Sequence, residues 1–475
     1  MKVYNSLNEI KSDISTGLIT CKDLVLDYLN NIESKKHLNV FLEVYSEEAL
    51  LKAEEIDQKI KAGNAGKLAG MVIGLKDVLC HKNHGLQASS KILQNFISQF
   101  DGTAVKRLIE EDAIIIGRQN CDEFAMGSSN ENSAFGNVLN DIDNTKVPGG
   151  SSGGSAVAVQ ANMCLVSIGS DTGGSVRQPA AFCGIIGLKP TYSRISRYGL
   201  VAYASSFDCI GPITRSLEDA ALVLEVIAGK DENDSTVSHQ SVPKYSDLLQ
   251  FDKKAKIGYL KEAFAKGISE DVKLATQSTL DLLKESGHEV EEISFPMLEY
   301  ILPTYYILTT AEASSNLSRF DGVKYGYRSP NATDLESLYK KTRSEGFGKE
   351  VKKRIMLGTF ILSAGFYDAY YSKAQKVRRI LKEETDQLLE KYDFIVVPTT
   401  PDTAFKIGEH SSDPISMYLA DLFTVQANLV GIPAISIPNG KDKQGMPIGL
   451  QIMTKSFGEE NLLAFSKYIL EISKN

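Results

Sequence analysis

The chain has 475 residues, of which 43% are hydrophobic and 24% charged, the proportions of an ordinary folded protein. Its formal net charge of −8 argues against a basic surface for nucleic acid, so such a partner would need a local patch or another subunit. No run of about eighteen apolar residues is present, and we expect no membrane span. The first residues include acidic side chains and lack an apolar core, so we expect no signal peptide.

Cysteine usage favours a reducing compartment. None of the six cysteines forms a C-x-x-C pair, and no Cys/His group has the spacing of zinc ligands, so we expect no metal. Scattered cysteines in a chain of this size are typical of buried, reduced thiols, which predicts a cytoplasmic protein.

The first 65 residues are predicted to be helical. Apolar residues recur at helical spacing over 6–17, 21–36 and 47–63, and the last helix is expected to stop at Gly63. The period then changes, because residues 71–79 form a short apolar run typical of a strand.

From there helices alternate with apolar strands. We predict strands at 71–79, 114–117, 164–171, 256–260, 288–296, 392–401 and 432–438, and helices at 105–113, 155–163, 175–184, 272–287 and 461–475. This alternation predicts an α/β fold with a central mixed β-sheet covered by helices on both faces. No repeat or low-complexity linker divides the chain, so we expect one domain over 1–475, with residues 1–65 packed on the α/β core.

The stretch VPGGSSGGS at residues 147–155 allows three interpretations. It fits the G-x-S-x-G nucleophile elbow with Ser152 as nucleophile, and it also fits a flexible linker. The elbow is disfavoured because the polar segment DIDNTKVPGG, not an apolar strand, precedes it, and no histidine stands near a matching motif. In the third interpretation this loop supplies a proton relay for a nucleophile elsewhere.

That nucleophile is expected in DTGGS at residues 171–175, a turn between an apolar strand and a helix. Successive backbone N–H groups of such a turn can form an anion-binding nest, and Ser175 would lie beside it. Its base can be Lys76, at the end of an apolar strand, because burial among hydroxyl groups would favour a neutral lysine. Asp77 would point to the opposite face of that strand.

At these residues the sequence resembles the amidase signature family, through GLKD at 74–77, GGSSGGS at 149–155 and GSDTGGSVRQPA at 169–180. The resemblance implies that Lys76 is the base, Ser151 a bridging serine with a cis peptide bond, and Ser175 the nucleophile. It places the oxyanion hole at the N–H groups around Thr172, Gly173 and Gly174.

Further segments, at 124–135, 193–208, 211–216, 353–360 and 420–434, resemble the glutaminase members of this family that serve tRNA-dependent amidotransferases. This implies glutamine as substrate, with Arg354 for its carboxylate, Asp421 for its ammonium, and contacts from Ser128 and Tyr306.

The same resemblance implies two partner subunits, B and C, in a heterotrimer that converts Glu-tRNA(Gln) to Gln-tRNA(Gln) with the released ammonia. No cofactor is expected in this chain; ATP, Mg and tRNA are expected mainly at the partner subunit. The alternatives are a stand-alone amidase acting on another small amide, or a catalytically idle scaffold.

Overall fold

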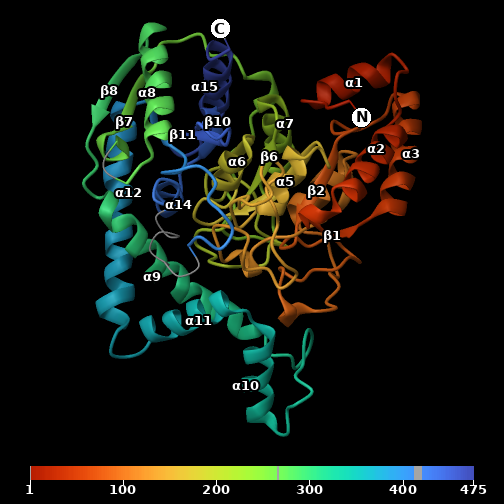
Figure 1. Ribbon diagram of the computed structural model, residues 1–475, viewed down its shortest axis with the longest axis vertical. Helices are drawn as coiled ribbons and strands as arrows, with labels where there is room; N and C mark the ends of the chain where they lie inside the picture. The colour runs from red at the N-terminus through yellow and green to blue at the C-terminus, as the bar shows by residue number, and fades with distance from the viewer. Residues whose placement is uncertain (1, 265–266, 411–419, 475) are drawn as a thin grey trace.

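The computed structural model describes residues 2–264, 267–410 and 420–474. Its centre is one mixed sheet of eleven strands in the order β1-β3-β2-β4-β6-β5-β10-β11-β9-β7-β8 (Figure 1). The strands are β1 (Phe41–Val44), β2 (Val72–Lys76), β3 (Ile114–Gln119), β4 (Val166–Asp171), β5 (Ile186–Lys189), β6 (Cys209–Thr214), β7 (Lys256–Leu260), β8 (Glu289–Ile293), β9 (Phe394–Pro398), β10 (Ala434–Lys441) and β11 (Pro447–Met453). The predicted α/β class with a mixed sheet is confirmed.

The helices of the described part of the chain precede, separate and follow these strands. They are α1 (Leu7–Ser15), α2 (Cys21–Ser34), α3 (Ser46–Ala62), α4 (Thr103–Glu110), α5 (Gly153–Gln160), α6 (Arg177–Cys183), α7 (Leu217–Ile227), α8 (Glu270–Glu285), α9 (Leu298–Asn316), α10 (Leu335–Gly346), α11 (Lys349–Ile361), α12 (Lys373–Lys391), α14 (Val425–Val430) and α15 (Glu459–Ile472). None of them is both long and apolar enough to cross a bilayer.

The three N-terminal helices form as predicted, and Gly63 ends α3 in a left-handed conformation. The short strand β1 between α2 and α3 was not predicted from the sequence, since four residues carry little periodicity. It pairs antiparallel with β3 at the edge of the sheet. Strand β2 ends on Lys76, as the apolar run indicated, and pairs in parallel with β3 and β4.

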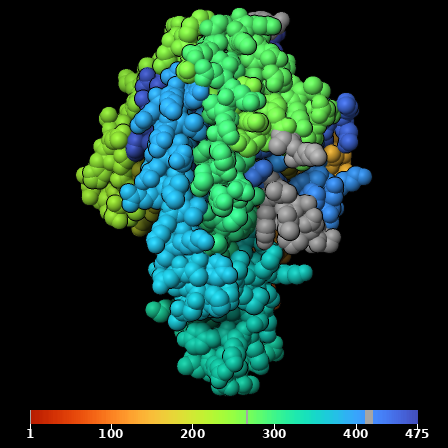
Figure 2. All heavy atoms as spheres, turned by 90° about the vertical axis from the view of Figure 1, so that its left-hand side faces the viewer, coloured from red at the N-terminus to blue at the C-terminus, as the bar shows by residue number. Residues whose placement is uncertain are grey.

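A helical projection extends from the body of the molecule. Figure 1 shows α10 and α11 below the body of the molecule, joined to it by α9 and α12, and Figure 2 shows this extension at the lower end of another face. Because α9 packs against α11, residues of both helices share one end of the projection.

A buried ion pair fixes the turn between β4 and α6. The Arg177 Nε and Nη2 atoms donate to the Asp171 carboxylate at 3.0 and 2.9 Å, and both side chains are fully buried. Arg177 also donates to the Thr424 carbonyl and to Asn428, which tie the turn to α14. Burial alone would raise the pKa of Asp171, but the Arg177 charge outweighs it and lowers that pKa to about 2.

Replacing Arg177 by Met should lower the free energy of unfolding by about 3–5 kcal/mol, because Asp171 would remain buried without its counter-ion. Urea denaturation measures this loss. Arg379→Met is the matched control: its i,i+4 pair with Glu383 is exposed to solvent, so this variant should lose far less stability than Arg177→Met. Equal losses in the two variants would contradict a stabilising role of the buried pair.

Candidate active site

Lys76 lies in a pocket of serine hydroxyls. Its Nζ atom donates to the Oγ atoms of Ser151 at 2.7 Å, Ser152 at 2.9 Å and Ser170 at 2.9 Å. The Asp77 carboxylate instead accepts a hydrogen bond from the Arg118 Nη1 atom at 2.8 Å, so Asp77 lies on the opposite face of the strand, as predicted. The nearest acceptors of the lysine are therefore neutral.

The electrostatics of Lys76 suit a base. Complete burial disfavours the ammonium form and lowers the pKa of Lys76 to about 8, although surrounding carboxylates oppose this shift. On the order of a tenth of the Lys76 side chains are then neutral at pH 7 and can accept a proton, far more than for an ordinary lysine.

The hydrogen bonds separate the roles of two adjacent serines. Ser152 donates its own proton to the Ser170 carbonyl at 3.2 Å. The Ser151 hydroxyl contacts only Lys76 among the described residues, so its proton is uncommitted. The peptide bond between Gly150 and Ser151 is cis, as the family resemblance implied. These contacts favour Ser151 over Ser152 as a proton relay.

Ser175 lies beside this loop. Its carbonyl accepts the Ser152 N–H at 3.2 Å, which joins the 171–175 turn to the glycine-rich loop. The Ser175 residue is 8% exposed, whereas Ser151 and Ser152 are fully buried. An approaching molecule can therefore reach Ser175 more readily than Ser152, which favours Ser175 as the nucleophile over the elbow interpretation.

The 171–175 turn offers free backbone N–H groups, but Gly174, which was expected to be one of them, is not free. The Gly174 N–H donates to the Asp171 carboxylate at 2.9 Å and is therefore occupied. Within the described ranges, the N–H groups of Thr172, Gly173 and Ser175 donate to no protein acceptor. Buried donors without partners are rare, so these three N–H groups can serve a bound oxyanion.

Gly174 shapes this turn instead of donating to a ligand. Its φ of +129° lies in a region that side chains rarely adopt, and a Cβ there would lie 2.2 Å from the Thr424 hydroxyl. A Cβ on Gly173 would lie 2.5 Å from the Tyr305 hydroxyl. Both positions therefore require glycine.

Two further predicted residues meet at one side of the site. The Ser128 hydroxyl donates to the Asp421 carboxylate at 2.5 Å. Gln178 links this pair to the glycine-rich loop, because it donates to the Ser128 carbonyl at 2.7 Å and accepts the Gly150 N–H at 2.9 Å. Burial raises the pKa of Asp421 to about 7, so a nearby cation would be needed to stabilise its charged form.

Arg354 and Tyr306 also lie together. The Arg354 guanidinium lies 5.6 Å from the ring centres of Tyr203 and Tyr306. It donates to Glu350 and to the Tyr203 hydroxyl, both at 2.8 Å, while its Nη2 atom donates to no described residue. That nitrogen is available for an anion, although Arg354 is only 5% exposed.

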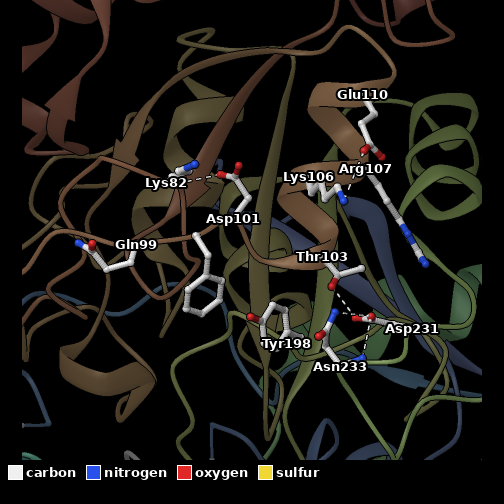
Figure 3. A pocket seen from close by; sticks show the side chains of 11 residues that line it. Lys82, Gln99, Asp101, Thr103, Lys106, Arg107, Glu110, Tyr198, Asp231 and Asn233 are labelled. Carbon is white, nitrogen blue, oxygen red and sulfur yellow. Dashed lines mark hydrogen bonds and ion pairs between the residues drawn. The ribbon is translucent and has the colours of Figure 1, made fainter.

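Several supporting residues were missed by sequence analysis. Ser170, Asp171 and Arg177 stand within the quoted motif GSDTGGSVRQPA, but nothing in their spacing distinguished support from catalysis. Tyr203 gave no signal, because its contact with Arg354 joins residues far apart in the sequence. Glu350 lies four residues before Arg354 on α11, and this i,i+4 spacing could have indicated the pair. The hollow of about 430 Å³ in Figure 3, lined by Lys82 and Asp231 among others, contains none of the predicted site residues.

The reactivity of Ser175 should depend on the charge of Lys76. Below a pH of about 8 the lysine is protonated, so the rate of Ser175 modification by a fluorophosphonate should fall about tenfold per pH unit. Timed labelling followed by peptide mass spectrometry measures this rate. A labelling rate that does not change between about pH 6 and pH 8 would contradict Lys76 as the base.

Several known proteins are similar to this chain in sequence. The amidase family profile matches residues 23–463. The A subunit of the glutamyl-tRNA(Gln) amidotransferase of Chlorobium limicola is 51% identical over 468 residues, covering 98% of this chain and 99% of that protein. The Chlorobaculum tepidum protein of the same name is 51% identical over 470 residues, covering 98% of each chain.

A solved structure agrees with these relatives. The crystal structure of the A subunit of the glutamyl-tRNA(Gln) amidotransferase from Thermotoga maritima aligns with a TM-score of 0.77 and 39% identity, covering 94% of this chain and 90% of that chain. Together with the family profile and the lysine–serine geometry, this similarity shows that the chain belongs to the amidase signature family.

Proposed function

We propose that this chain is the glutaminase subunit of a tRNA-dependent amidotransferase, which hydrolyses glutamine and supplies ammonia to a partner. The observation that carries the proposal is a buried cation and a buried anion, Arg354 and Asp421, beside the serine machinery of an amidase. Free glutamine has an α-carboxylate and an α-ammonium, so it would match both charges while its side-chain amide reaches Ser175.

In this mechanism, neutral Lys76 accepts the proton of Ser151 as Ser151 takes the proton of Ser175. The Ser175 oxygen then bonds to the amide carbon, and the oxyanion accepts hydrogen bonds from the free N–H groups of Thr172 and Gly173. The carbon–nitrogen bond breaks as the proton returns through Ser151 to the leaving ammonia. Water then attacks the glutamyl ester, with Lys76 again as the base.

The substrate contacts divide by charge. Arg354 would bind the α-carboxylate through Nη2, and Tyr306 lies against its guanidinium. Asp421 would bind the α-ammonium, and Ser128 orients the Asp421 carboxylate. The ammonium would also keep Asp421 ionised against the effect of burial.

The assembly is part of the proposal. The similar proteins are named as the A subunit of an amidotransferase, which supports a complex with two other subunits, B and C, in which ATP and Mg²⁺ act at the partner that binds tRNA. Six unpaired, buried thiols support a cytoplasmic location. One continuous core from Tyr4 to Ile469 supports a single domain over the chain.

The test compares ammonia release from glutamine and from propionamide, which lacks both charged groups. Arg354→Lys should raise the KM for glutamine about tenfold to a hundredfold, because a point charge replaces a planar donor, and should leave the KM for propionamide unchanged. Arg379→Lys, on an exposed side chain, is the matched control.

Lys76→Ala should reduce hydrolysis of both amides by about a thousandfold or more, since the proton has no acceptor. Efficient hydrolysis of propionamide with no preference for glutamine would favour a stand-alone amidase. Normal turnover by the Lys76→Ala variant would contradict the mechanism itself.

A further inference from the structure

A second cluster of reactive side chains lies beyond the end of β2. The residues after Lys76 lead into a turn at 80–84 that contains His81 and His84, whose rings are stacked 3.9 Å apart. Glu48, in the first turn of α3, reaches this pair from another part of the chain. One ligand atom from each of the three side chains lies within 4.8 Å of the other two. Sequence analysis predicted no metal, because no Cys/His group has the spacing of zinc ligands and Glu48 is distant in sequence from both histidines.

The two ring nitrogens of His84 have different neighbours. Its Nδ1 atom lies 2.8 Å from the Lys82 carbonyl oxygen, which can only accept, so Nδ1 carries the hydrogen. The Nε2 atom lies 2.8 Å from a Glu48 carboxylate oxygen. Two acceptors at this distance require a cation between them, either a proton on Nε2 or a metal ion. A backbone carbonyl on one imidazole nitrogen is the usual second contact of a metal-binding histidine.

His81 provides an independent observation. It is 8% exposed, and its Nδ1 atom has no hydrogen-bond partner among the described residues. A neutral imidazole at this position can offer a ring-nitrogen lone pair to a metal ion. A buried ring nitrogen without a partner calls for an explanation.

The turn is held in place before any ligand binds. The Asp101 carboxylate accepts the Lys82 N–H at 2.8 Å, and Figure 3 shows these residues side by side. The Ser98 N–H donates to the His84 carbonyl at 2.9 Å. A hollow of about 250 Å³, lined by Glu48 and His81, gives access from solvent. The Glu48 side chain is 59% exposed and can move to adjust its distance.

We propose that Glu48, His81 and His84 bind a zinc-type divalent cation that joins α3 to the segment following the catalytic lysine. Two imidazoles and one carboxylate are a donor set that zinc accepts, leaving a fourth position for water. Donors on a tetrahedral zinc ion lie about 3.3 Å apart, so a small outward shift of Glu48 makes room. The stacked histidine rings separate when both coordinate one ion.

The experiment uses the purified full-length chain, stripped with a chelator and dialysed against Zn²⁺ over a range of concentrations. The wild type should bind one Zn²⁺ at least tenfold more tightly than Glu48→Gln and than His84→Ala. Glu48→Gln changes one exposed side chain, so a folding defect does not confound it; circular dichroism checks both variants. The matched control replaces two exposed histidines outside the cluster, His37→Ala with His239→Ala, and should bind like the wild type.

A thermal readout accompanies the binding data. Zn²⁺ should raise the unfolding temperature of the wild type and the control but not that of the two cluster variants. Equal Zn²⁺ affinity in the wild type and both cluster variants would overturn the proposal. So would a loss of binding in the His37/His239 control alone, which would assign the ion to surface histidines.

Discussion

The burial of Lys76 among hydroxyl groups is the constraint on which the rest of the site depends. An ammonium group inside a protein is stable only with a counter-ion, and here the three shortest contacts are with Ser151, Ser152 and Ser170. Burial thereby lowers the pKa of Lys76 to about 8 and makes the neutral amine accessible, and a neutral amine is what a serine nucleophile requires in the absence of a histidine.

That constraint demands that the nearby carboxylates be engaged elsewhere. Asp77 pairs with Arg118, and Asp171 pairs with Arg177. The Asp122 carboxylate accepts the backbone N–H groups of Asn130 and Asn132, at 2.9 and 3.1 Å. Each of these carboxylates is held by donors of its own, so none pairs with Lys76. The same bonds shape the loops, because Asp171 also holds the Gly174 N–H and so turns the neighbouring donors toward the site.

The positions of the catalytic residues could be predicted from the sequence, because they lie in local motifs next to recognisable strands. Lys76, Ser151 and Ser175 lie in short motifs whose glycines mark close backbone approach, and the strand periodicity placed β2 and β4 next to them. Asp77 was correctly placed on the opposite face by strand alternation alone.

The remainder depends on contacts that strand periodicity and glycine motifs do not encode. The Gly174 N–H was expected to face a ligand, but its partner Asp171 lies three residues earlier and captures it. Tyr203 meets Arg354 only through the tertiary fold, since the two residues are 151 positions apart. The Glu48–His84 contact likewise joins residues 36 positions apart, between a helix and a turn.

The central claim is that Ser175, and not a serine of the glycine-rich loop, forms the bond to substrate. Rapid acid quenching of the chain during turnover of glutamine, followed by peptide mass spectrometry, tests it most directly. The account predicts a glutamyl ester on Ser175 that accumulates and decays with ammonia release. A glutamyl group on Ser151 or Ser152, or turnover without any acylated serine, would contradict it.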